Sequence, residues 1–503
     1  MTAVLGTIDL DHANEELGGI LLPKAPERKE WSERYSEWFH RVISEVPIYD
    51  TRYPVKGTGI WTPFGYKLRR AVIEKIRDML EEAGHEEVLF PLLIPDYMLG
   101  KEGEHVKDFE DEVYWVTRGG KDPLDVKLAL RPTSETAIYP MFQLWINAYS
   151  DLPLKIFQIV NVFRYETKAT KPMIRVREVS TFKEAHTAHA SKEDAESQVE
   201  KGVEIYSRIF EGMKIPFVKS VRPEWDKFPG AEYTVAFDTI LPDNKVLQVG
   251  TVHFLGQGFA KAFDIKYMKS DGGYEHVWQT CYGISERAIA ALISVHGDDS
   301  GLVLPSTFAP VQAVIIPIVY KGKEEEVTNK CKEADCLLKS EGIRSVVDDR
   351  KDITPGNKYF TWELRGAPIR IEIGPRDLEN STAVLVRRDT LQKTTIQMQE
   401  LVEGVHKMLK EIDFSLMERA DLWFKSKLTN AEDVEGIKSK LDKVGGIVEA
   451  PWCGARGCGE EMEGKLDGRI LGTPYKETHD VAGKRCANCG REASTIIRIG
   501  RSY

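Results

Sequence analysis

Two segments of the chain combine arginine, glutamate and aromatic residues in an order suited to holding a nucleotide. The first begins with Phe163-Arg164-Tyr165-Glu166 and ends at Phe182, and the second reads Tyr282-Gly283-Ile284-Ser285-Glu286-Arg287. The chain has no glycine-rich phosphate loop. Arginine can replace such a loop, because its planar fork binds phosphate oxygens in a bidentate way. The pattern therefore predicts a fold whose strands present arginines to a nucleotide.

Strand geometry gives each of these residues a predicted place. Alternate residues of a strand share a face, so Arg164 is expected to meet a phosphate while Glu166 accepts from an amino group. A returning strand would carry Phe182 beneath the base. Arg287 is predicted at a strand-to-helix junction, where a helix N-terminus favours anions. The alternative is a surface ion pair between Arg164 and Glu166 with Phe182 in the core; the ordered downstream motifs favour the nucleotide site.

The first 300 residues predict an antiparallel sheet with helices packed around it, an α+β fold without a β-α-β rhythm. The predicted helices are 28–46, Tyr66–Ala83, Thr133–Ala148 and Ser191–Met213, and the predicted strands are Val88–Leu92, Lys155–Val162, Val176–Phe182 and Lys245–Phe254. Pro140 predicts a kink or break in its helix. Pro91 inside a strand predicts a sheet edge, which suits the pairing of two subunits or simply ends the sheet.

The sequence changes character after the turn-rich hinge Gly297–Gly301. Predicted strands Val311–Val319, Ser345–Val347 and Ile369–Ile373 alternate with predicted helices Lys323–Ser340 and Lys358–Leu364. This indicates a small α/β domain with helices on both sides of its strands. A charged helical linker is predicted from Thr395 to about Glu411. We therefore expect three domains, at residues 1–300, 301–410 and 411–503.

Composition excludes several classes of protein. A net charge of −10 argues against non-specific coating of nucleic acid, although residues 168–183 form a local basic stretch. The longest apolar run, Ala313–Val319, is far shorter than the ~20 residues of a membrane span. The N-terminus turns acidic at Asp9 and lacks the features of a signal peptide. We therefore expect a cytoplasmic protein that does not enter membranes.

Four of the seven cysteines form a Cys-x4-Cys and Cys-x2-Cys pattern near the C-terminus: Cys453, Cys458, Cys486 and Cys489. Each pair has a neighbouring glycine, and four thiolates suit a closed, tetrahedral, structural zinc site. Two disulfides are disfavoured in a cytoplasmic chain, and an iron–sulfur cluster is a further alternative. Four protein ligands leave no open position, so we expect no catalysis at this metal.

Taken together, these motifs resemble those of the class II aminoacyl-tRNA synthetases. That class has a helix and strand ending in proline (here up to Pro91), Phe-Arg-x-Glu with a returning aromatic (Phe163 to Phe182), and Gly-x-x-x-Arg on a helix (Gly283 to Arg287). Lys266–Ser270 superficially resembles a class I signature. The chain lacks the His-x-Gly-His partner of that signature and a Rossmann fingerprint, so this segment is interpreted as a polar turn.

Further segments narrow the resemblance to one family. Arg131–Thr136 is similar to the class IIa segment that holds the amino acid, and Gln248–His253, Trp278–Gly283 and the ending Arg498–Tyr503 are similar to the prolyl-tRNA synthetases. The resemblance is to their archaeal and eukaryotic-like type and covers essentially the whole chain. It implies a class II catalytic domain, an α/β anticodon-binding domain and a small α+β C-terminal zinc-binding domain.

The resemblance also implies site residues. Contacts with proline would come from Thr133, Glu135, Arg164 and His253, with Trp225 either walling the pocket or lying in the core. Contacts with ATP would come from Arg164, Glu166, Arg175, Val176, Phe182, Gln248, Thr251, Ser285 and Arg287. Arg164 and Arg287 would do the catalytic work by stabilising phosphate charge, and Mg²⁺ would lie near Gln248 and Glu166. The alternative for His253 is a strand histidine with a purely structural hydrogen bond.

In the second domain, arginines and carboxylates near strand ends could recognise the edges of unstacked anticodon bases. The candidates are Glu363, Arg370, Arg376 and Asp377, and a solvated salt-bridge surface is the alternative for each. The implied activity is ATP-dependent charging of tRNA(Pro) with L-proline by a homodimer. Between His186 and Gly283 there is no room for an editing insertion, so misactivation of alanine is expected, with cysteine a further candidate.

Two other functions stay open at this point. One is another class IIa synthetase, such as the threonyl enzyme, against which the Gln248–His253 segment and the cysteine module argue. The other is a non-catalytic tRNA-binding or regulatory paralogue. The presence of Arg164, Glu166 and Arg287 argues against it, because a protein that only binds tRNA does not need arginines for ATP.

Overall fold

The computed structural model describes residues 26–99, 112–320 and 322–503. The acidic N-terminal segment around Asp9 therefore lies outside the described residues. The described residues form two compact units, one made of residues in the ranges 32–295 and 420–503, and the other of residues 26–31 and described residues of the range 296–419. Within the described ranges, no helix combines the length and the apolar character needed to cross a membrane.

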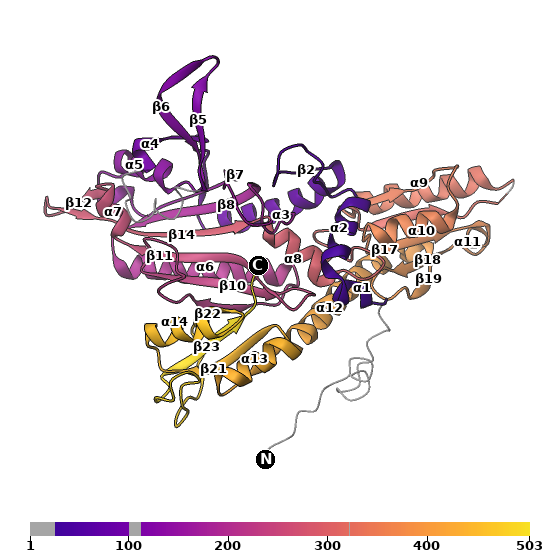
Figure 1. The fold of residues 1–503 in the computed structure, drawn as a ribbon. Coiled ribbons are helices and arrows are strands. Elements are labelled where there is room, and N and C mark those ends of the chain that lie inside the picture. The colour runs from indigo at the N-terminus through magenta and orange to yellow at the C-terminus, as the bar shows by residue number, and fades with distance from the viewer. Residues whose placement is uncertain (1–25, 100–111, 321) are drawn as a thin grey trace. The chain divides into compact units, whose positions relative to one another are not determined.

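The larger unit is built on an 11-stranded sheet of order β20-β21-β23-β22-β9-β10-β11-β14-β8-β7-β3. Its central strands lie side by side in Figure 1: β10 (Tyr233–Ile240), β11 (Val246–Gly256), β14 (Trp278–Ser285), β8 (Glu178–His189) and β7 (Leu154–Phe163). Within this set of five, neighbouring strands are antiparallel. The predicted antiparallel-sheet α+β class is thus confirmed.

The two faces of this sheet have different roles. Helix α6 (Lys192–Gly212) packs on one face, and Ser191 caps it by accepting a hydrogen bond from the Asp194 amide at 3.1 Å. On this face Gly202 lies so close to the sheet that a Cβ there would be 3.2 Å from Val252. The alternate residues point to the other face, where His253, Cys281 and His186 are aligned across three strands. That second face is left free to form a site.

Several predicted elements need correction. The helix predicted at 28–46 is two helices, α1 (Lys29–Glu33) and α2 (Tyr35–Glu45). The strand predicted at Val88–Leu92 is wrong, because pairing with β7 is confined to β3 (Glu86–Glu87). Beyond it, the Phe90 amide donates to the Gln158 side chain at 2.9 Å instead of a ladder partner. The predicted edge is nevertheless confirmed, since β3 is the last strand of the sheet.

Three other helices of the larger unit lie close to the ranges and junctions predicted for them. Helix α3 spans Pro63–Glu82, with Thr62 as its N-cap, and Gly84 follows its end at a φ of 78° that favours glycine. Helix α5 spans Glu135–Trp145 and keeps Pro140 inside it. Helix α8 runs from Arg287 to His296, directly after β14, which confirms the predicted strand-to-helix junction.

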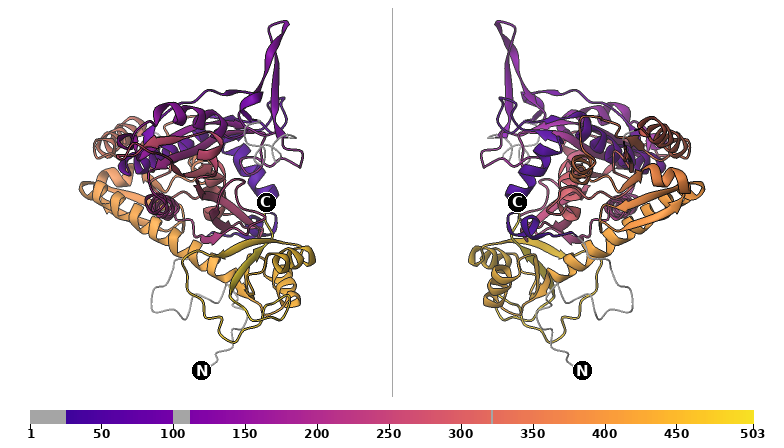
Figure 2. Two further views of the ribbon diagram at one scale, coloured as in Figure 1. Left: turned by 90° about the vertical axis from the view of Figure 1, so that its left-hand side faces the viewer. Right: turned by 90° about the vertical axis from the view of Figure 1, so that its right-hand side faces the viewer.

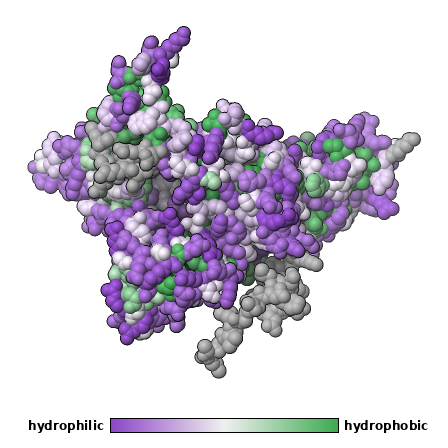
Figure 3. All heavy atoms as spheres, in the orientation of Figure 1, coloured by the Kyte–Doolittle hydropathy of each residue, from purple (hydrophilic) through white to green (hydrophobic). Residues whose placement is uncertain are grey.

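A hairpin of β5 (Tyr114–Gly119) and β6 (Asp122–Leu130) extends a three-stranded sheet with β4 (Leu93–Pro95). In both turned views it stands out from the rest of its unit (Figure 2). Its side chains are of mixed character, with apolar residues among the hydrophilic ones at the top of Figure 3. Trp115 is 43% exposed and Val126 is 40% exposed.

The C-terminal segment completes the large sheet. It contributes β20 (Leu428–Asn430), β21 (Ile447–Trp452), β22 (Arg469–Pro474) and β23 (Thr495–Gly500), with helices α13 (Val434–Lys443) and α14 (Arg456–Lys465). Strand β22 pairs with β9 (Val218–Val221), with Thr473 opposite Val221. The sheet therefore continues without a break from the C-terminal strands into the central ones.

The smaller unit contains a five-stranded sheet of order β16-β15-β17-β18-β19. Its strands are β15 (Ala313–Pro317), β16 (Ser345–Val347), β17 (Ile369–Ile373), β18 (Thr382–Arg387) and β19 (Lys393–Gln397). Ile315 packs with α9 (Glu324–Ser340) in one apolar cluster, while its neighbour Val314 packs with Trp362 of α10 (Pro355–Leu364) in another. Helices on both sides of the strands are therefore confirmed.

The helical linker predicted from Thr395 to Glu411 is wrong in its bounds. Thr395 belongs to β19, and the helix is α12, which runs from Leu401 to Ser426. Helix α12 thus extends through the predicted domain boundary at residue 410. Strands β18 and β19 were not predicted.

Candidate active site

A cavity of about 330 Å³ lies in the larger unit, and strands β8, β11 and β14 contribute to its lining. With the exception of Trp225, every residue predicted to contact proline or ATP lines it: Thr133, Glu135, Arg164, Glu166, Arg175, Val176, Phe182, Gln248, Thr251, His253, Ser285 and Arg287. Their sequence positions span more than 150 residues, so it is the antiparallel pairing that brings them together. Phe182 and Ser285, for example, are cross-strand partners.

One end of the cavity carries a fixed negative charge. Glu135, the first residue of α5, is only 2% exposed. Thr133 Oγ1 donates to its Oε2 atom, and Cys281 Sγ approaches its Oε1 atom at 3.9 Å. Burial raises the pKa of the Cys281 thiol well above its usual range, and the neighbouring Glu135 carboxylate raises it further. A neutral thiol beside a held carboxylate is suited to a cationic ligand.

His253 lines the same end of the cavity from β11. Its Nδ1 atom is 2.8 Å from Thr234 Oγ1, and its ring centroid is 4.5 Å from that of Phe228. The hydrogen bond to Thr234 is of the kind expected if His253 were a strand histidine with a purely structural role. They also fix the ring at the cavity wall, so a structural hydrogen bond and a ligand contact are compatible here.

Arg164 was predicted to lie on a strand. In the structure it directly follows the last residue of β7, Phe163, and lies outside the strand. Its amide donates to Arg177 O at 2.8 Å and its Nε atom donates to Pro132 O at 3.2 Å. The guanidinium is 6.0 Å from the centre of the Phe182 ring. Burial lowers the pKa of Arg164, and nearby carboxylates, among them Glu135, oppose that shift. An anionic ligand would relieve the cost of burying this cation.

Two further arginines converge on the other end of the cavity. Arg287 Nε donates to Ile174 O at 2.8 Å, which anchors the guanidinium against the loop that carries Arg175. Burial, together with repulsion from Arg164 and Arg175, lowers the pKa of Arg287 to about 10. Arg175 Nε is 3.8 Å from Glu166 Oε2. Arg164, Arg175 and Arg287 repel one another here, which makes this end of the cavity suited to an anion.

Gln248, at the cavity edge, is held by an arginine that the sequence did not indicate. Its Oε1 atom accepts from Arg222 Nη2 at 2.8 Å, and the same guanidinium group donates to Asp238 Oδ1 at 2.7 Å. Ser285 Oγ accepts from the Arg287 amide at 3.3 Å and so caps the start of α8. Both predicted ATP residues therefore line the cavity with existing hydrogen-bond partners.

Sequence reasoning missed Glu184 and His186, which line the cavity from β8. Glu184 accepts hydrogen bonds from Ser134 Oγ and from Gln158 Nε2, the latter at 2.9 Å, and its Oε2 atom is 3.3 Å from His186 Nε2. Burial opposes ionisation of Glu184, but these partners outweigh it and hold its pKa low. Both residues could have been predicted from the sequence, because Phe182, Glu184 and His186 are spaced two residues apart and alternate residues of a strand share one face.

Glu286 is another lining residue that the motif analysis did not single out. Its Oε2 atom accepts from the Ser180 amide at 3.0 Å and from Ser180 Oγ at 2.7 Å. Burial raises the pKa of Glu286 to about 7. The side chain therefore fastens the end of β14 to the start of β8, close to Phe182.

Trp225 is placed outside the cavity. Its indole packs against the apolar cluster of the C-terminal segment, and its Nε1 atom donates to Glu463 Oε2 at 3.1 Å. Of the two roles considered for it, the structure gives the core role. Its neighbours Asp226, Lys227 and Phe228 do line the cavity.

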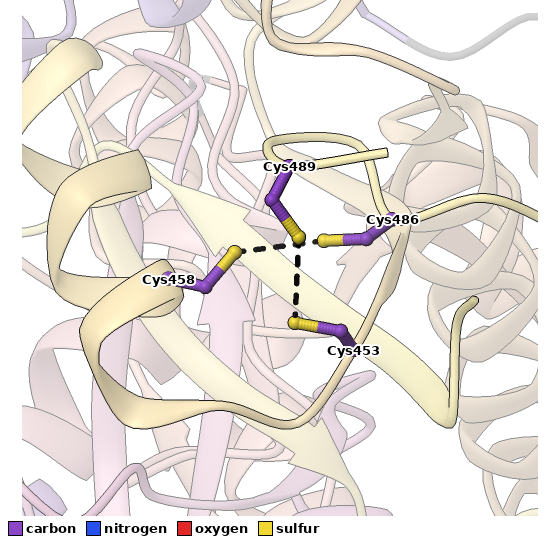
Figure 4. Close-up of side chains that lie close together, drawn as sticks. All are labelled: Cys453, Cys458, Cys486 and Cys489. Carbon is purple, nitrogen blue, oxygen red and sulfur yellow. Dashed lines mark hydrogen bonds between the residues drawn. The ribbon is translucent and has the colours of Figure 1, made fainter. Parts of the chain in front are cut away.

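The four C-terminal cysteines point toward one centre (Figure 4). All four Sγ atoms lie within 4.8 Å of one another, with Cys458 to Cys486 at 3.6 Å and Cys489 to Cys453 at 3.7 Å. Disulfides are absent from this set, since all four are free thiols. A tetrahedral zinc with Zn–S bonds of about 2.3 Å needs sulfurs about 3.8 Å apart, so the donor set fits that ion.

The surroundings of the cysteines also suit thiolate ligands. Arg491 Nε donates to Cys489 Sγ at 3.3 Å, and this contact lowers the pKa of that thiol to about 6. Asn488 Nδ2 donates to Cys458 Sγ at 3.4 Å, although burial raises the pKa of Cys458 to about 12. A bound cation would reverse that burial effect, because it stabilises the thiolate.

In the smaller unit, the predicted anticodon residues are differently engaged. Arg370 is 8% exposed, pairs with Glu363 and with Glu372 Oε1 at 3.0 Å, and lies 4.0 Å above the Tyr359 ring. Arg376 is exposed. Asp377 uses both oxygens locally, accepting from the Gly374 amide at 2.8 Å and from Thr382 Oγ1 at 3.1 Å, which caps helix α11 (Pro375–Asn380).

Comparison with known proteins gives a consistent result over the whole chain. Three family models match: residues 114–296 match "tRNA synthetase class II core domain (G, H, P, S and T)", residues 312–408 match "Anticodon binding domain", and residues 434–503 match "Prolyl-tRNA synthetase, C-terminal". The proline–tRNA ligase of Methanopyrus kandleri is 52% identical over 487 residues, 97% of this chain and 99% of the relative. That of Aeropyrum pernix is 51% identical over 95% of this chain and 99% of the relative.

A solved structure is similar as well. The Giardia lamblia prolyl-tRNA synthetase in complex with prolyl-adenylate superimposes with a TM-score of 0.91 and 36% sequence identity. The match covers 95% of this chain and 100% of the other.

Proposed function

Because this chain belongs to the prolyl-tRNA synthetase family, we propose that its cavity is the site where L-proline and ATP form prolyl-adenylate. The chain catalyses the ATP-dependent joining of proline to tRNA. The observation that carries the assignment of the site is the position of Arg164, which interacts electrostatically with Glu135 at one end of the cavity and with Arg287 at the other.

The chemistry requires no general base. A proline carboxylate oxygen attacks the α-phosphorus, the bond from that phosphorus to the bridging oxygen of pyrophosphate breaks, and pyrophosphate leaves. In the second step, a hydroxyl of the 3′-terminal ribose of tRNA(Pro) attacks the carbonyl carbon, its proton passes to a phosphate oxygen of the adenylate, the bond from the carbonyl carbon to the phosphate oxygen breaks, and AMP leaves. Both steps depend mainly on positioning and on stabilising charge at phosphate oxygens.

Each end of the cavity has a distinct task in this scheme. The Glu135 carboxylate accepts from the proline ring ammonium, while Thr133 and His253 shape the pocket around the ring. Arg164 bridges the proline carboxylate and the α-phosphate. Arg287 holds the γ-phosphate at the far end.

ATP is held by the residues that line the arginine-rich end. Phe182 stacks on adenine, and Glu166, Arg175, Val176, Gln248, Thr251 and Ser285 surround the nucleotide. Class II synthetases use ATP with Mg²⁺. We assign Gln248 and Glu166 to Mg²⁺, because their amide and carboxylate oxygens can bind the ion directly or bind the water molecules around it. The ion would add positive charge beside phosphates that the arginines already hold.

The cysteine cluster is assigned to a structural zinc ion held by Cys453, Cys458, Cys486 and Cys489. The spacing of the four sulfurs and their Arg491 and Asn488 partners support this assignment. An iron–sulfur cluster is the alternative with the same ligands. Metal analysis of the purified protein distinguishes them: one zinc per chain supports the proposal, and iron with acid-labile sulfide contradicts it.

We assign the protein to the cytoplasm and to a homodimer. All seven cysteines are free thiols, which agrees with a reducing compartment. The segment that follows α3 exposes several apolar side chains, among them Leu89 at 81% and Tyr97 at 58%. Exposed apolar groups of this kind favour a subunit interface. Sedimentation equilibrium should give twice the mass of one chain; a monomer at micromolar concentration would contradict the dimer.

The decisive test of the function is ATP–pyrophosphate exchange with each proteinogenic amino acid. Proline should support rapid exchange. Exchange with threonine in place of proline would favour another class IIa synthetase. No exchange with any amino acid, from a protein that still binds tRNA, would favour a non-catalytic paralogue.

The same assay tests discrimination against alanine. Small apolar differences give only roughly 10–200-fold discrimination, and residues 187–282 hold β9, β10, β11, α6 and short elements with no editing module. We therefore expect measurable exchange with alanine, and we test cysteine beside it. Alanyl-adenylate or alanyl-tRNA should accumulate without hydrolysis by this chain; rapid hydrolysis in cis would contradict the prediction.

Anticodon recognition is tested by Arg370→Ala. Arg370 is paired with Glu363 and Glu372, so its loss should disorder a charged surface that we assign to anticodon bases. The Michaelis constant for tRNA(Pro) should rise about 10-fold, in line with ~1–3 kcal/mol for one bidentate base contact. Proline-dependent pyrophosphate exchange should not change. An unaltered Michaelis constant for tRNA would remove Arg370 from the candidates.

A further inference from the structure

Residues 222–229 form a loop that lies between two parts of the larger unit, and it is called the bridging loop below. Asp226, Lys227, Phe228 and Pro229 of this loop line the cavity. Phe228 rests on the His253 ring, and its amide donates at 3.0 Å to Thr234 Oγ1, the same atom that contacts His253 Nδ1. One side of the bridging loop therefore shapes the end of the cavity assigned to proline.

The other side of the bridging loop is held by the C-terminal segment. Trp225 packs in the apolar cluster that includes Cys458 and Cys486. Its indole donates to Glu463 of α14, and Arg222 Nη1 donates to Leu471 O of β22 at 2.6 Å. Arg469 adds a weaker contact, with its Nη1 atom 3.8 Å from Asp226 Oδ1. Three residues of one short loop are thus fastened to the cysteine-bearing part of the chain.

The contact between the indole and α14 is close enough to require glycine. A Cβ on Gly459 would lie 2.4 Å from the Trp225 Cη2 atom and 3.1 Å from its Cζ2 atom, with Trp452 Cζ2 next at 3.2 Å. The contact with Trp225 is therefore the one that a methyl group cannot enter without displacing the ring. Gly459 directly follows Cys458, one of the four clustered cysteines. The position of the indole is therefore set by the helix turn that the cysteine cluster holds.

We propose that the C-terminal cysteine module positions the proline end of the cavity through Trp225, which makes Trp225 and Gly459 positioning residues for amino-acid binding. The chain of contacts runs from the cysteine cluster to Gly459, to the Trp225 indole, along the bridging loop to Phe228, and from there to His253. Trp225 itself never touches the substrate. This inference rests on the proposed function insofar as it names the amino acid as proline.

Two glycine variants of α14 provide a matched pair. Gly459→Ala places a methyl group against the indole and should push it, and the bridging loop with it, out of place. Gly457→Ala makes the same chemical change on the other side of Cys458, where nothing lies within 4 Å of the new Cβ. Any general effect of alanine next to a cysteine ligand is common to both variants.

The first readout is steady-state kinetics. We expect Gly459→Ala to raise KM for proline at least about 5-fold and to leave KM for ATP within about 2-fold. The indole lies on the part of the loop that leads to Phe228, whereas Arg222, which holds Gln248, is anchored separately to Leu471 O. Gly457→Ala should match the unaltered chain in both constants. Equal KM values for proline in the two variants, or equal rises for proline and ATP in Gly459→Ala, would overturn the proposal.

A double-mutant cycle tests whether the indole is the path. Trp225→Phe removes the ring atoms that the new methyl group would strike. In that background Gly459→Ala should raise KM for proline no further, because the two changes act through one contact. A Gly459→Ala effect of undiminished size in the Trp225→Phe background would rule the indole out.

The second readout needs no substrate. Amide hydrogen exchange of residues 222–234 should be faster in Gly459→Ala than in Gly457→Ala, because the Asp226 amide donates to Pro223 O and the Ala231 amide donates to Phe228 O, each at 3.0 Å, and both acceptors belong to the bridging loop. Exchange in α6 should be the same in both. Unchanged exchange in the bridging loop would contradict the proposal even if the cavity bound another amino acid. Absence of proline-dependent activity in the unaltered chain would instead contradict the proposed function.

Discussion

Replacing Arg164 with alanine should abolish prolyl-adenylate formation. Arg164 stands between the Glu135 end and the Arg287 end of the cavity, and it is assigned to both reacting partners. Removing one donor that stabilises developing charge costs about 10²–10³-fold in rate, and Arg164 would serve proline and the α-phosphate together. We therefore expect ATP–pyrophosphate exchange to fall at least about 10³-fold.

The variant should still fold. Burial already disfavours the Arg164 charge, as its lowered pKa shows, so its removal relieves a desolvation cost. Thermal unfolding close to that of the unaltered chain would separate lost chemistry from lost structure. Arg208→Ala is the matched control, since Arg208 lies on α6 and pairs only loosely with Glu82, at 3.8 Å. Near-normal exchange in Arg164→Ala would refute the site.

Glu135→Gln should have the second largest effect, confined to proline. The amide keeps the size of the side chain and can still accept from Thr133, but it loses the negative charge that the ring ammonium requires. Removing one partner of a buried charge pair costs about 2–5 kcal/mol, so kcat/KM for proline should fall about 30-fold or more. KM for ATP should stay within about 3-fold.

The control for this variant is Glu211→Gln, because Glu211 is exposed and lies on α6, whose residues are not among those that line the cavity. It should leave both Michaelis constants unchanged. A Glu135→Gln chain that binds proline normally, or one that loses ATP and proline binding in equal measure, would show that Glu135 does not hold the ring ammonium.

The motif residues could be predicted because their roles depend on local order in the sequence. Arg164, Phe182 and Arg287 each occur in a short pattern, and strand pairing then brings them to the same face. Glu184 and His186 were missed although their two-residue spacing from Phe182 placed them on that face. The strand at Val88–Leu92 was mispredicted because the Phe90 amide donates to a side chain, Gln158, that no local pattern reveals.

The bridging loop shows what local reasoning cannot supply. Its sequence, Arg-Pro-Glu-Trp-Asp-Lys-Phe-Pro, indicates an irregular segment and little more. Arg222 contacts Gln248 and Leu471, and Trp225 contacts Glu463, at separations of 26, 249 and 238 residues. Such contacts follow from the order of strands in the sheet, which the sequence pattern alone does not give.

The pairing of β22 with β9 also has a consequence for how the chain is made. Strand β9 lies near residue 220, but the partner that covers its outer edge is synthesised some 250 residues later. A nascent chain on the ribosome therefore carries the central strands with an open edge until the C-terminal segment emerges. Translation that stops early leaves that edge exposed and able to pair with other chains. Strand β22 therefore also protects the sheet against edge-to-edge aggregation.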